Sequence, residues 1–316
     1  MMNLYSPCKL CPRSCGVDRL LGETGFCGES AHLRIGAAVL HRGEEPPLVG
    51  TGGSGTIFVS GCNLGCVFCQ NYQISQGEGG GASLGKEVST ETFAEICMKL
   101  SDRGAENINI VTGSHAILAL VQGIAAAKKE GLQIPVLWNS SAYESIEALE
   151  LLGDHIDIYL PDLKTLDSKI AAKFFNAPDY PAAAAAAILK MIDMAHNKAH
   201  DTADKSKKII IRHLILPGYL ESTHQVLRWF AENAAGRTQL SLMTQYTPIP
   251  NREQTAPKRY LRKDEYETVL GWLEEFEIND GFCQELVTGN DWLPDFRRSN
   301  PFSSELSVPV WPTSQT

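Results

Sequence analysis

No stretch of this 316-residue sequence approaches the ~18–20 consecutive apolar residues that a membrane-spanning helix needs. The first residues, MMNLYSPCKL, lack the charged start and the apolar centre of a secretory signal. Basic residues are in deficit, because 28 Lys and Arg face 37 Asp and Glu and give a net charge of −9. A nucleic-acid partner selects a basic surface, so the charge argues against one. We therefore expect a cytoplasmic protein that binds neither nucleic acid nor membrane.

Cysteine, by contrast, is abundant: the chain has nine, and seven of them precede residue 70. A reducing cytosol keeps thiols out of disulfides, so clustered cysteines predict metal binding. The first group is Cys8, Cys11, Cys15 and Cys27, and the second is Cys62, Cys66 and Cys69. Cys97 and Cys283 stand alone, and we expect both to be buried small apolar side chains.

From Thr56 onward, short β-branched runs alternate with helical patterns. The runs are TIFVS (56–60), NINIV (107–111), IPVLW (134–138), IDIYL (156–160), IIIRHLIL (209–216) and QLSLM (239–243). The helices that follow them are expected near 90–103, 115–130, 144–152, 180–199, 222–234 and 263–276. Such alternation indicates a parallel sheet with right-handed crossovers. Six units are too few to close an eight-stranded barrel, so we predict an α/β fold with a partial (βα)6 TIM-type barrel.

Composition divides the chain into three parts. Residues 1–50 form a Cys-rich metal-binding segment, residues 51–250 the (βα)6 core, and residues 251–316 a helix-and-loop extension. We expect the loop-rich end of this extension to cover one end of the barrel.

Polar or special residues follow the predicted strands. The cysteine triad follows the first strand and Asn139 the third, Asp162 and Lys164 follow the fourth, and Arg212 lies within the fifth. Parallel α/β barrels place their active sites at the carboxyl ends of the strands. We therefore expect these side chains to surround one site.

The triad has the spacing C-x3-C-x2-C. Thiolates are soft ligands that suit iron–sulfur clusters and zinc. A structural zinc site needs a fourth protein ligand. A four-iron cluster held by three cysteines instead leaves one iron free for an outside ligand.

This spacing directly after the first strand of a (βα)6 pattern resembles the radical S-adenosylmethionine (SAM) enzymes. The resemblance implies a [4Fe–4S] cluster on Cys62, Cys66 and Cys69 whose free iron binds the amino and carboxylate groups of SAM. It also implies that one electron from the cluster splits SAM into methionine and a 5′-deoxyadenosyl radical, which takes hydrogen from a substrate. The cofactor then carries the chemistry and the protein positions and shields it.

The resemblance also assigns cofactor-binding residues. Phe68 resembles the aromatic residue that contacts the adenine, and Asp162 and Lys164 resemble a pair near the methionine end. Arg212 resembles an arginine near the cofactor carboxylate, and His213 is expected to face the other way because strand side chains alternate. The turn Thr112-Gly113-Ser114-His115 replaces a Gly-Gly-Glu-like turn that holds the amino group. The expected set is Phe68, Thr112, Gly113, Ser114, His115, Asn139, Asp162, Lys164 and Arg212.

A narrower resemblance extends over nearly the whole chain. The segments CPRSCG, GFCG, WNSSAYE, DIYLPDLK, IRHLILPG, SLMTQY and LPDF resemble a subgroup related to pyruvate formate-lyase activating enzyme. It implies an electron donor such as flavodoxin or ferredoxin and a glycyl-radical enzyme as partner. Cys8, Cys11, Cys15 and Cys27 match either a structural zinc site or a second [4Fe–4S] cluster, and the spacing does not choose between them.

Two other functions stay open at this point. One is radical modification of a peptide or a small molecule. The other is a non-enzymatic zinc or iron–sulfur adaptor in which all seven clustered cysteines are structural ligands.

Overall fold

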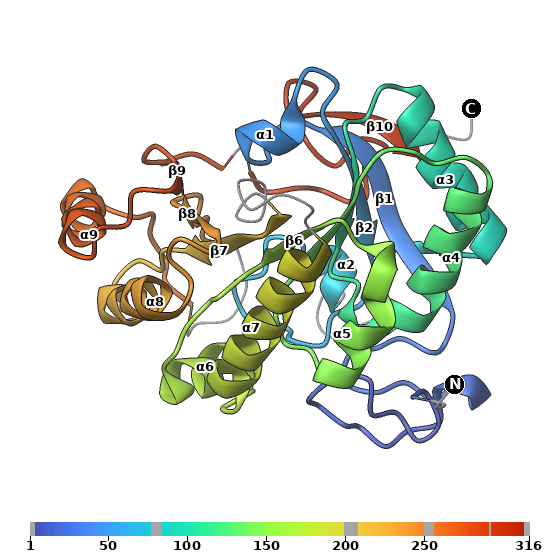
Figure 1. Cartoon of the computed structure of the whole chain (residues 1–316), viewed down its shortest axis with the longest axis horizontal. Coiled ribbons are helices and arrows are strands. Elements are labelled where there is room, and N and C mark those ends of the chain that lie inside the picture. Colours follow the sequence, from blue (N-terminus) through green and yellow to red (C-terminus); the bar gives the residue numbers. More distant parts are fainter. Residues whose placement is uncertain (1–3, 77–83, 199–207, 250–255, 291, 313–316) are drawn as a thin grey trace.

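Six parallel strands form the curved centre of the molecule, as the alternation of strand and helix patterns predicts (Figure 1). The structure is a computed structural model, which describes residues 4–76, 84–198, 208–249, 256–290 and 292–312. The strands are β2 (Ser54–Val59), β4 (Ile108–Val111), β5 (Val136–Ser140), β6 (Ile158–Pro161), β7 (Ile210–Leu214) and β8 (Gln239–Met243). Each overlaps its predicted run, and the predicted partial barrel is confirmed.

The parallel strands follow the order β2-β4-β5-β6 and then β7-β8. Two isolated parallel bridges, Tyr159 to Ile209 and Asp162 to Arg212, join β6 to β7 and complete the curve. A short strand, β9 (Gly281–Cys283), pairs parallel with β8.

Helices cover the outer side of the sheet (Figure 1). Those in the predicted places are α3 (Thr90–Asp102), α4 (Ile117–Lys129), α5 (Ile146–Leu152), α7 (Tyr180–Lys198), α8 (Leu220–Asn233) and α9 (Lys263–Glu275). Helix α3 begins where the Ser89 hydroxyl accepts the backbone N–H of Thr92, a typical N-cap. The others are α1 (Pro46–Val49), α2 (Tyr72–Ser75) and α6 (Ser168–Phe175), with 3-10 turns η1 (Arg19–Leu21), η3 (Ser114–Ala116) and η4 (Gly153–His155).

Three strands that the sequence did not predict extend the sheet beyond β2. Strand β1 (Leu33–His41) pairs antiparallel with β2, and both β10 (Ser307–Trp311) and β3 (Lys86–Val88) pair antiparallel with β1. The sequence of β1, LRIGAAVLH, has small residues at its centre, which have a low preference for strands. Its pairing with strands on both sides compensates for this preference.

Both chain extensions therefore lie close to the first strand of the barrel. The N-terminal cysteine-rich segment lies near α5 (Figure 1), where the Ser145 hydroxyl donates to the Leu10 carbonyl at 3.1 Å. On the inner side, Phe296 from the C-terminal extension packs with Val39 and Phe58 of β1 and β2. These contacts bring residues from both ends of the chain to the region around the cysteine triad.

Candidate active site

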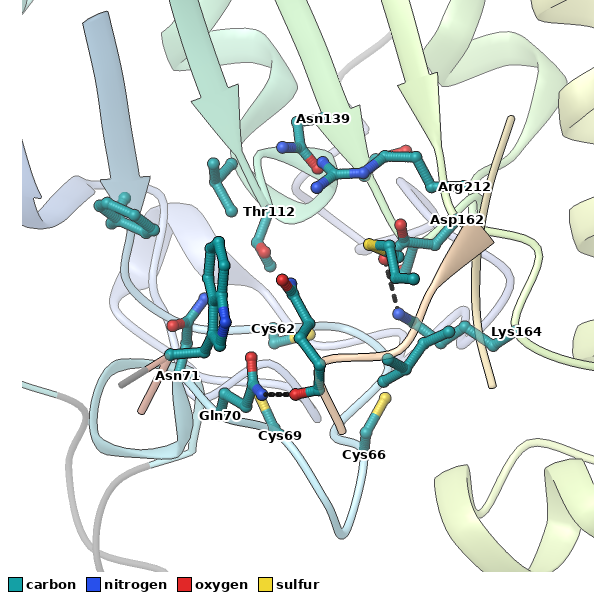
Figure 2. A pocket seen from close by; sticks show the side chains of 18 of the residues that line it. Cys62, Cys66, Cys69, Gln70, Asn71, Thr112, Asn139, Asp162, Lys164 and Arg212 are labelled. Carbon is teal, nitrogen blue, oxygen red and sulfur yellow. Dashed lines mark hydrogen bonds and ion pairs between the residues drawn. The ribbon is translucent and has the colours of Figure 1, made fainter. Parts of the chain in front are cut away.

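The cysteine triad lies in the loop directly after β2, and all three side chains line one cavity at the carboxyl ends of the strands (Figure 2). Gly61 gives the loop its sharp turn with a φ of +82°, and a Cβ there would lie 2.4 Å from Glu29 and 2.9 Å from His115. Only glycine fits at such a position. The local sequence thus turns the chain so that the three thiols face the same space.

The surroundings of the thiols fit an iron–sulfur cluster. The Leu64 N–H and the Ser75 hydroxyl donate hydrogen bonds to the sulfurs of Cys62 and Cys69, each at 3.4 Å, and hydrogen bonds to sulfur tune such clusters. Burial raises the pKa of the Cys62 and Cys66 thiols, so metal binding must displace their protons. Within the described residues, no three His, Cys, Asp or Glu side chains have the geometry to hold a metal ion.

Asp162 and Lys164 line the same cavity from the end of β6. The Lys164 ammonium donates to Asp162 at 2.6 Å, and the Tyr180 hydroxyl fixes this turn by donating to the Asp162 carbonyl and accepting from the Lys164 N–H. Although burial opposes its charge, the carboxylate of Asp162 raises the pKa of Lys164. The cavity therefore contains a fixed ammonium group near Cys66, whose charge also acts on it.

Arg212 points into the barrel from β7 and lies near Asn139 in Figure 2. Its guanidinium is paired with two carboxylates of the protein itself, Glu44 at 3.3 Å and Glu45 at 3.2 Å. The family resemblance implies that this guanidinium lies near the cofactor carboxylate. The sequence analysis did not predict that Glu44 and Glu45 would pair with it. His213 faces the other way, as expected, and its ring contacts the Leu163 carbonyl and the Thr223 hydroxyl.

The four residues of the turn after β4, 112–115, do not all line the same cavity. Thr112 lines the main cavity with a φ of +63°, a conformation that is rare for a β-branched residue and often marks a functional site. Gly113 and Ser114 are absent from the residues that line the cavity. His115 lies instead in a second cavity beside the N-terminal cysteines. Of the four, only Thr112 therefore shares the cavity of the cysteine triad.

Glu144, which the sequence analysis did not single out, holds this turn in place. Its buried carboxylate accepts from the Ser114 hydroxyl at 2.8 Å, the Trp138 indole at 2.7 Å and the Ser140 hydroxyl at 3.0 Å. It thus links the ends of β4 and β5. Glu144 and two of its three partners, Trp138 and Ser140, lie within the sequence segment WNSSAYE. This segment was the part of the sequence from which the interaction could have been predicted.

The remaining predicted residues also reach the cavity. Phe68 lines it and packs edge-to-face against Phe174, Phe175 and Tyr246, with ring centroids 5.6 to 5.9 Å apart. Asn139 lines it from β5. Residues that the sequence did not predict also line it, among them His41, Glu44, Phe58, Gln70, Asn71, Gln245, Trp292 and Phe302.

The four N-terminal cysteines surround the second, smaller cavity, together with Arg13, Arg19 and Asn63. Cys8, Cys11 and Cys27 are buried and Cys15 is exposed. A Cβ on Gly25 would lie 2.8 Å from the Cys15 sulfur, so the glycine leaves room for this thiol. The four thiols line one space, and a metal bound by them stays a prediction.

The two isolated cysteines differ from each other. Cys97 is fully buried in α3, as expected. Cys283 is exposed on β9, where its thiol lies 3.8 Å from the Tyr266 hydroxyl, so its predicted burial is wrong. Strand β9 is short and has a neighbour on one side only, which leaves this side chain uncovered.

The main cavity has a volume of about 210 Å³, which is below the usual range of small-molecule sites, roughly 300–1,000 Å³. Residues 56–230, which contain the triad and most of the barrel, match the family model for the radical SAM superfamily. The chain belongs to the radical SAM superfamily. Membership implies a [4Fe–4S] cluster and SAM as cofactors, and an enzyme that performs radical chemistry.

The chain is also similar to individual proteins. Uncharacterized protein MJ0674 of Methanocaldococcus jannaschii is 29% identical over 287 residues, which cover 88% of this chain and 77% of that protein. The fold is similar to that of methylornithine synthase (PylB), with a TM-score of 0.45, 13% identity and coverage of 80% of this chain and 73% of PylB. It is also similar to Streptococcus suis SuiB bound to S-adenosylmethionine, with a TM-score of 0.42 and 18% identity. That match covers 71% of this chain and 45% of SuiB.

No helix among the described residues is long and apolar enough to cross a membrane.

Proposed function

We propose that the main cavity is the active site and that Cys62, Cys66 and Cys69 hold one [4Fe–4S] cluster there, with one iron free for SAM. The observation that carries this proposal is that the three thiols line the same cavity as the Asp162–Lys164 pair. Soft thiolates suit the cluster. The fixed ammonium group of Lys164 suits an anionic group of the bound cofactor.

When bound, the reduced cluster and SAM would supply a one-electron cleavage of SAM that removes one hydrogen atom from the substrate, with methionine and 5′-deoxyadenosine as products. The protein binds and orients the reactants and excludes water. We assign contacts with SAM to Phe68, Thr112, Asn139, Asp162, Lys164 and Arg212. The role of Gly113, Ser114 and His115 stays a prediction, and their position favours shaping the turn around Thr112.

Anaerobic reconstitution with iron and sulfide, followed by reduction and addition of SAM, tests the reaction. We expect wild-type protein to release 5′-deoxyadenosine and Cys66→Ala to release at least ~100-fold less, because the cluster loses a ligand. Cys283→Ala, which removes an exposed thiol outside the cavity, is the matched control. A wild-type protein that binds metal but forms no 5′-deoxyadenosine would support the adaptor function instead.

A glycine of a partner enzyme is our first candidate substrate, and the Asp162-Leu163-Lys164 segment, which resembles activating enzymes, supports it. Copurification of a glycyl-radical enzyme, and an organic radical signal on it after incubation with SAM and reductant, would test this function. Absence of such a partner from the organism's proteome contradicts it.

Radical modification of a peptide or a small molecule is the second candidate. The cavity extends inward past the strand ends to Glu44 and Arg212, and this depth favours a substrate group that enters the barrel.

For Cys8, Cys11, Cys15 and Cys27 we propose a second metal site, either a structural zinc or a second [4Fe–4S] cluster. Metal analysis of a Cys8→Ala, Cys11→Ala variant decides between them. Loss of zinc indicates a structural site, and loss of about four irons per chain indicates a cluster. A cytoplasmic donor such as flavodoxin or ferredoxin fits as the source of electrons.

A further inference from the structure

The cysteine loop and the end of β8 meet at one wall of the main cavity. Gln70 directly follows Cys69 in the loop after β2, and Gln245 comes just after β8. Among the described strands, β8 pairs with β7 and β9 and not with β2. Gln70 joins the two segments, because its side-chain amide donates to the Gln245 carbonyl at 2.7 Å, a hydrogen bond drawn as a dashed line in Figure 2. Both glutamines line the cavity, and both are partly exposed.

The hydrogen bonds around Gln245 fix the direction of its side-chain amide. A backbone N–H can only donate, so the Gln284 atom that the Thr244 N–H contacts at 2.9 Å is the acceptor Oε1. The NH2 group of Gln284 is then the donor, and it donates to Oε1 of Gln245 at 3.0 Å. The NH2 group of Gln245 is therefore not used by Gln284 and has two N–H donors to offer.

The amide of Gln70 is oriented by the same reasoning. A carbonyl can only accept, so the group of Gln70 that contacts the Gln245 carbonyl is its NH2 group. Its Oε1 atom lies on the other side of the amide and points into the cavity (Figure 2). Within the described part of the chain, Oε1 of Gln70 and Nε2 of Gln245 have no hydrogen-bond partner. The wall thus presents a free acceptor and a free donor from two neighbouring amides.

A neutral donor beside a neutral acceptor is also what one β-strand presents to the next. In an antiparallel pair of strands, two opposite residues exchange both of their N–H···O bonds. The NH2 group of Gln245 can take the place of the N–H in such a pair, and Oε1 of Gln70 the place of the C=O. A carboxylate has no donor for the Gln70 oxygen, and an apolar group would leave both amides unpaired, which costs free energy.

We infer that Gln70 and Gln245 bind the main chain of an extended peptide substrate. The carbonyl of one substrate residue accepts from Gln245, and the N–H of that residue donates to Gln70. The peptide is then held beside the loop that carries the cysteine triad. This inference rests on the proposed function, and it favours a peptide over a small molecule without an amide group as the substrate.

Ligand-observed NMR with the reconstituted, SAM-bound protein before reduction tests the inference without turnover. The probes are N-acetylglycine N-methylamide, its diester analogue methyl acetoxyacetate, and butanamide. The first two share their shape and both carbonyls, but only the diamide has N–H donors. We expect the diester to bind at least ~5-fold more weakly, because it leaves the Gln70 oxygen unpaired. Equal binding of the diester overturns the inference, and tighter binding of butanamide overturns it in favour of a side-chain amide.

Gln245→Met removes the free donor and keeps the length of the side chain. We expect this variant to bind N-acetylglycine N-methylamide at least ~5-fold more weakly than wild type. Gln239→Met is the matched control at the other end of β8, where the amide donates to Asp280, and it should leave binding unchanged. Gln245→Glu keeps the acceptor for Gln284 and lacks the donor, so it should weaken binding as Gln245→Met does. Unchanged binding by either folded Gln245 variant contradicts the inference.

Two further measurements separate the inference from the cofactor chemistry. Gln245→Met should bind SAM as wild type does, and a loss of SAM affinity of ~5-fold or more overturns the inference, since the amide would then belong to the SAM site. Failure of N-acetylglycine N-methylamide to bind to a wild-type protein that releases 5′-deoxyadenosine overturns the inference alone. Binding of this probe by a wild-type protein that releases no 5′-deoxyadenosine contradicts the proposed function instead.

Discussion

Glu44 lies in an environment that a carboxylate does not prefer. Burial raises the pKa of its carboxyl group to about 7, and the charges of Glu45 and Asp162 act in the same direction. Arg212 and the hydrogen bond from Asn109 oppose the increase. A buried carboxyl group of this kind costs stability when it is ionised.

The raised pKa predicts the effect of Glu44→Gln on stability. In the folded protein Glu44 holds its proton up to about pH 7, whereas its ordinary pKa is 4.5, so wild-type protein loses stability as the pH rises between these values. Glutamine resembles the protonated form at every pH. We expect the variant to gain up to about 3 kcal/mol relative to wild type between pH 4.5 and pH 8, measured by urea unfolding without ligand. A difference that does not change with pH would contradict the assignment.

At the scale of residues, the sequence predicts the parts of the site that lie within a motif. Cys62, Cys66, Cys69, Asp162 and Lys164 occupy strand ends and share the cavity as expected. Glu44 and Trp292 were not predicted, because they come from loops that approach the site only after β1 and β10 have paired with the sheet.

At the scale of elements, helix α9 is attached to the barrel through Glu265. Glu265 in its first turn accepts hydrogen bonds from the guanidinium of Arg259 at 2.6 and 2.8 Å, from the Arg262 N–H, and from the Gly218 N–H in the loop after β7. The hydrogen bond from Arg259 is the largest cause that lowers the pKa of Glu265 to about 2. This carboxylate links α9 to the end of a barrel strand.

Glu265→Gln should therefore destabilise the protein only where the carboxylate is ionised. The lowered pKa means that its contribution is complete above the ordinary value of 4.5 and is lost as the pH falls toward 2. Allowing for the partly exposed Arg259, we expect a loss of about 1 to 2 kcal/mol at pH 7 and almost none near pH 2. Thermal unfolding at several pH values measures this difference. An equal loss at both ends of the range would show that the effect is not electrostatic.

The six strand–helix units were predictable because each buries a β-branched run and is followed by an amphipathic helix. Strand β1 and helix α6 were not predicted. The centre of β1 has a weak strand signal, and α6 (SKIAAKFF) is a short helix between β6 and α7. Such elements depend on tertiary contacts, which a sequence pattern does not contain.

At the scale of the whole molecule, both chain extensions contact the segment that carries the cysteine loop and α2. Arg13 in the N-terminal segment donates to the Asn63 and Leu64 carbonyls at 3.0 and 3.2 Å. Gln73 in α2 donates to Asp295 at 3.0 Å and accepts from the Phe296 N–H at 2.7 Å, so it binds the LPDF segment. The position of the triad therefore depends on residues far from it in the sequence.

Gln73→Ala should loosen the C-terminal extension. It removes two buried hydrogen-bond partners, so we expect the free energy of unfolding to fall by about 1 to 3 kcal/mol. Amide hydrogen exchange in residues 293–302 should become faster. Gln225→Ala, which removes an exposed hydrogen bond to Glu221 within α8, is the matched control and should leave both measurements unchanged. Unaltered exchange in this segment would show that other contacts suffice to hold it.

The position of β10 has a consequence for how the protein matures. Strand β1 pairs on one side with β2 and on the other with β10, which is formed by residues 307–311. A nascent chain thus carries its seven clustered cysteines out of the ribosome long before the last strand of their sheet exists, since translation adds ~5–20 residues per second. We expect loading of iron to follow release of the full-length polypeptide, so that premature termination upstream of residue 307 yields a chain that assembles its metallocentre poorly.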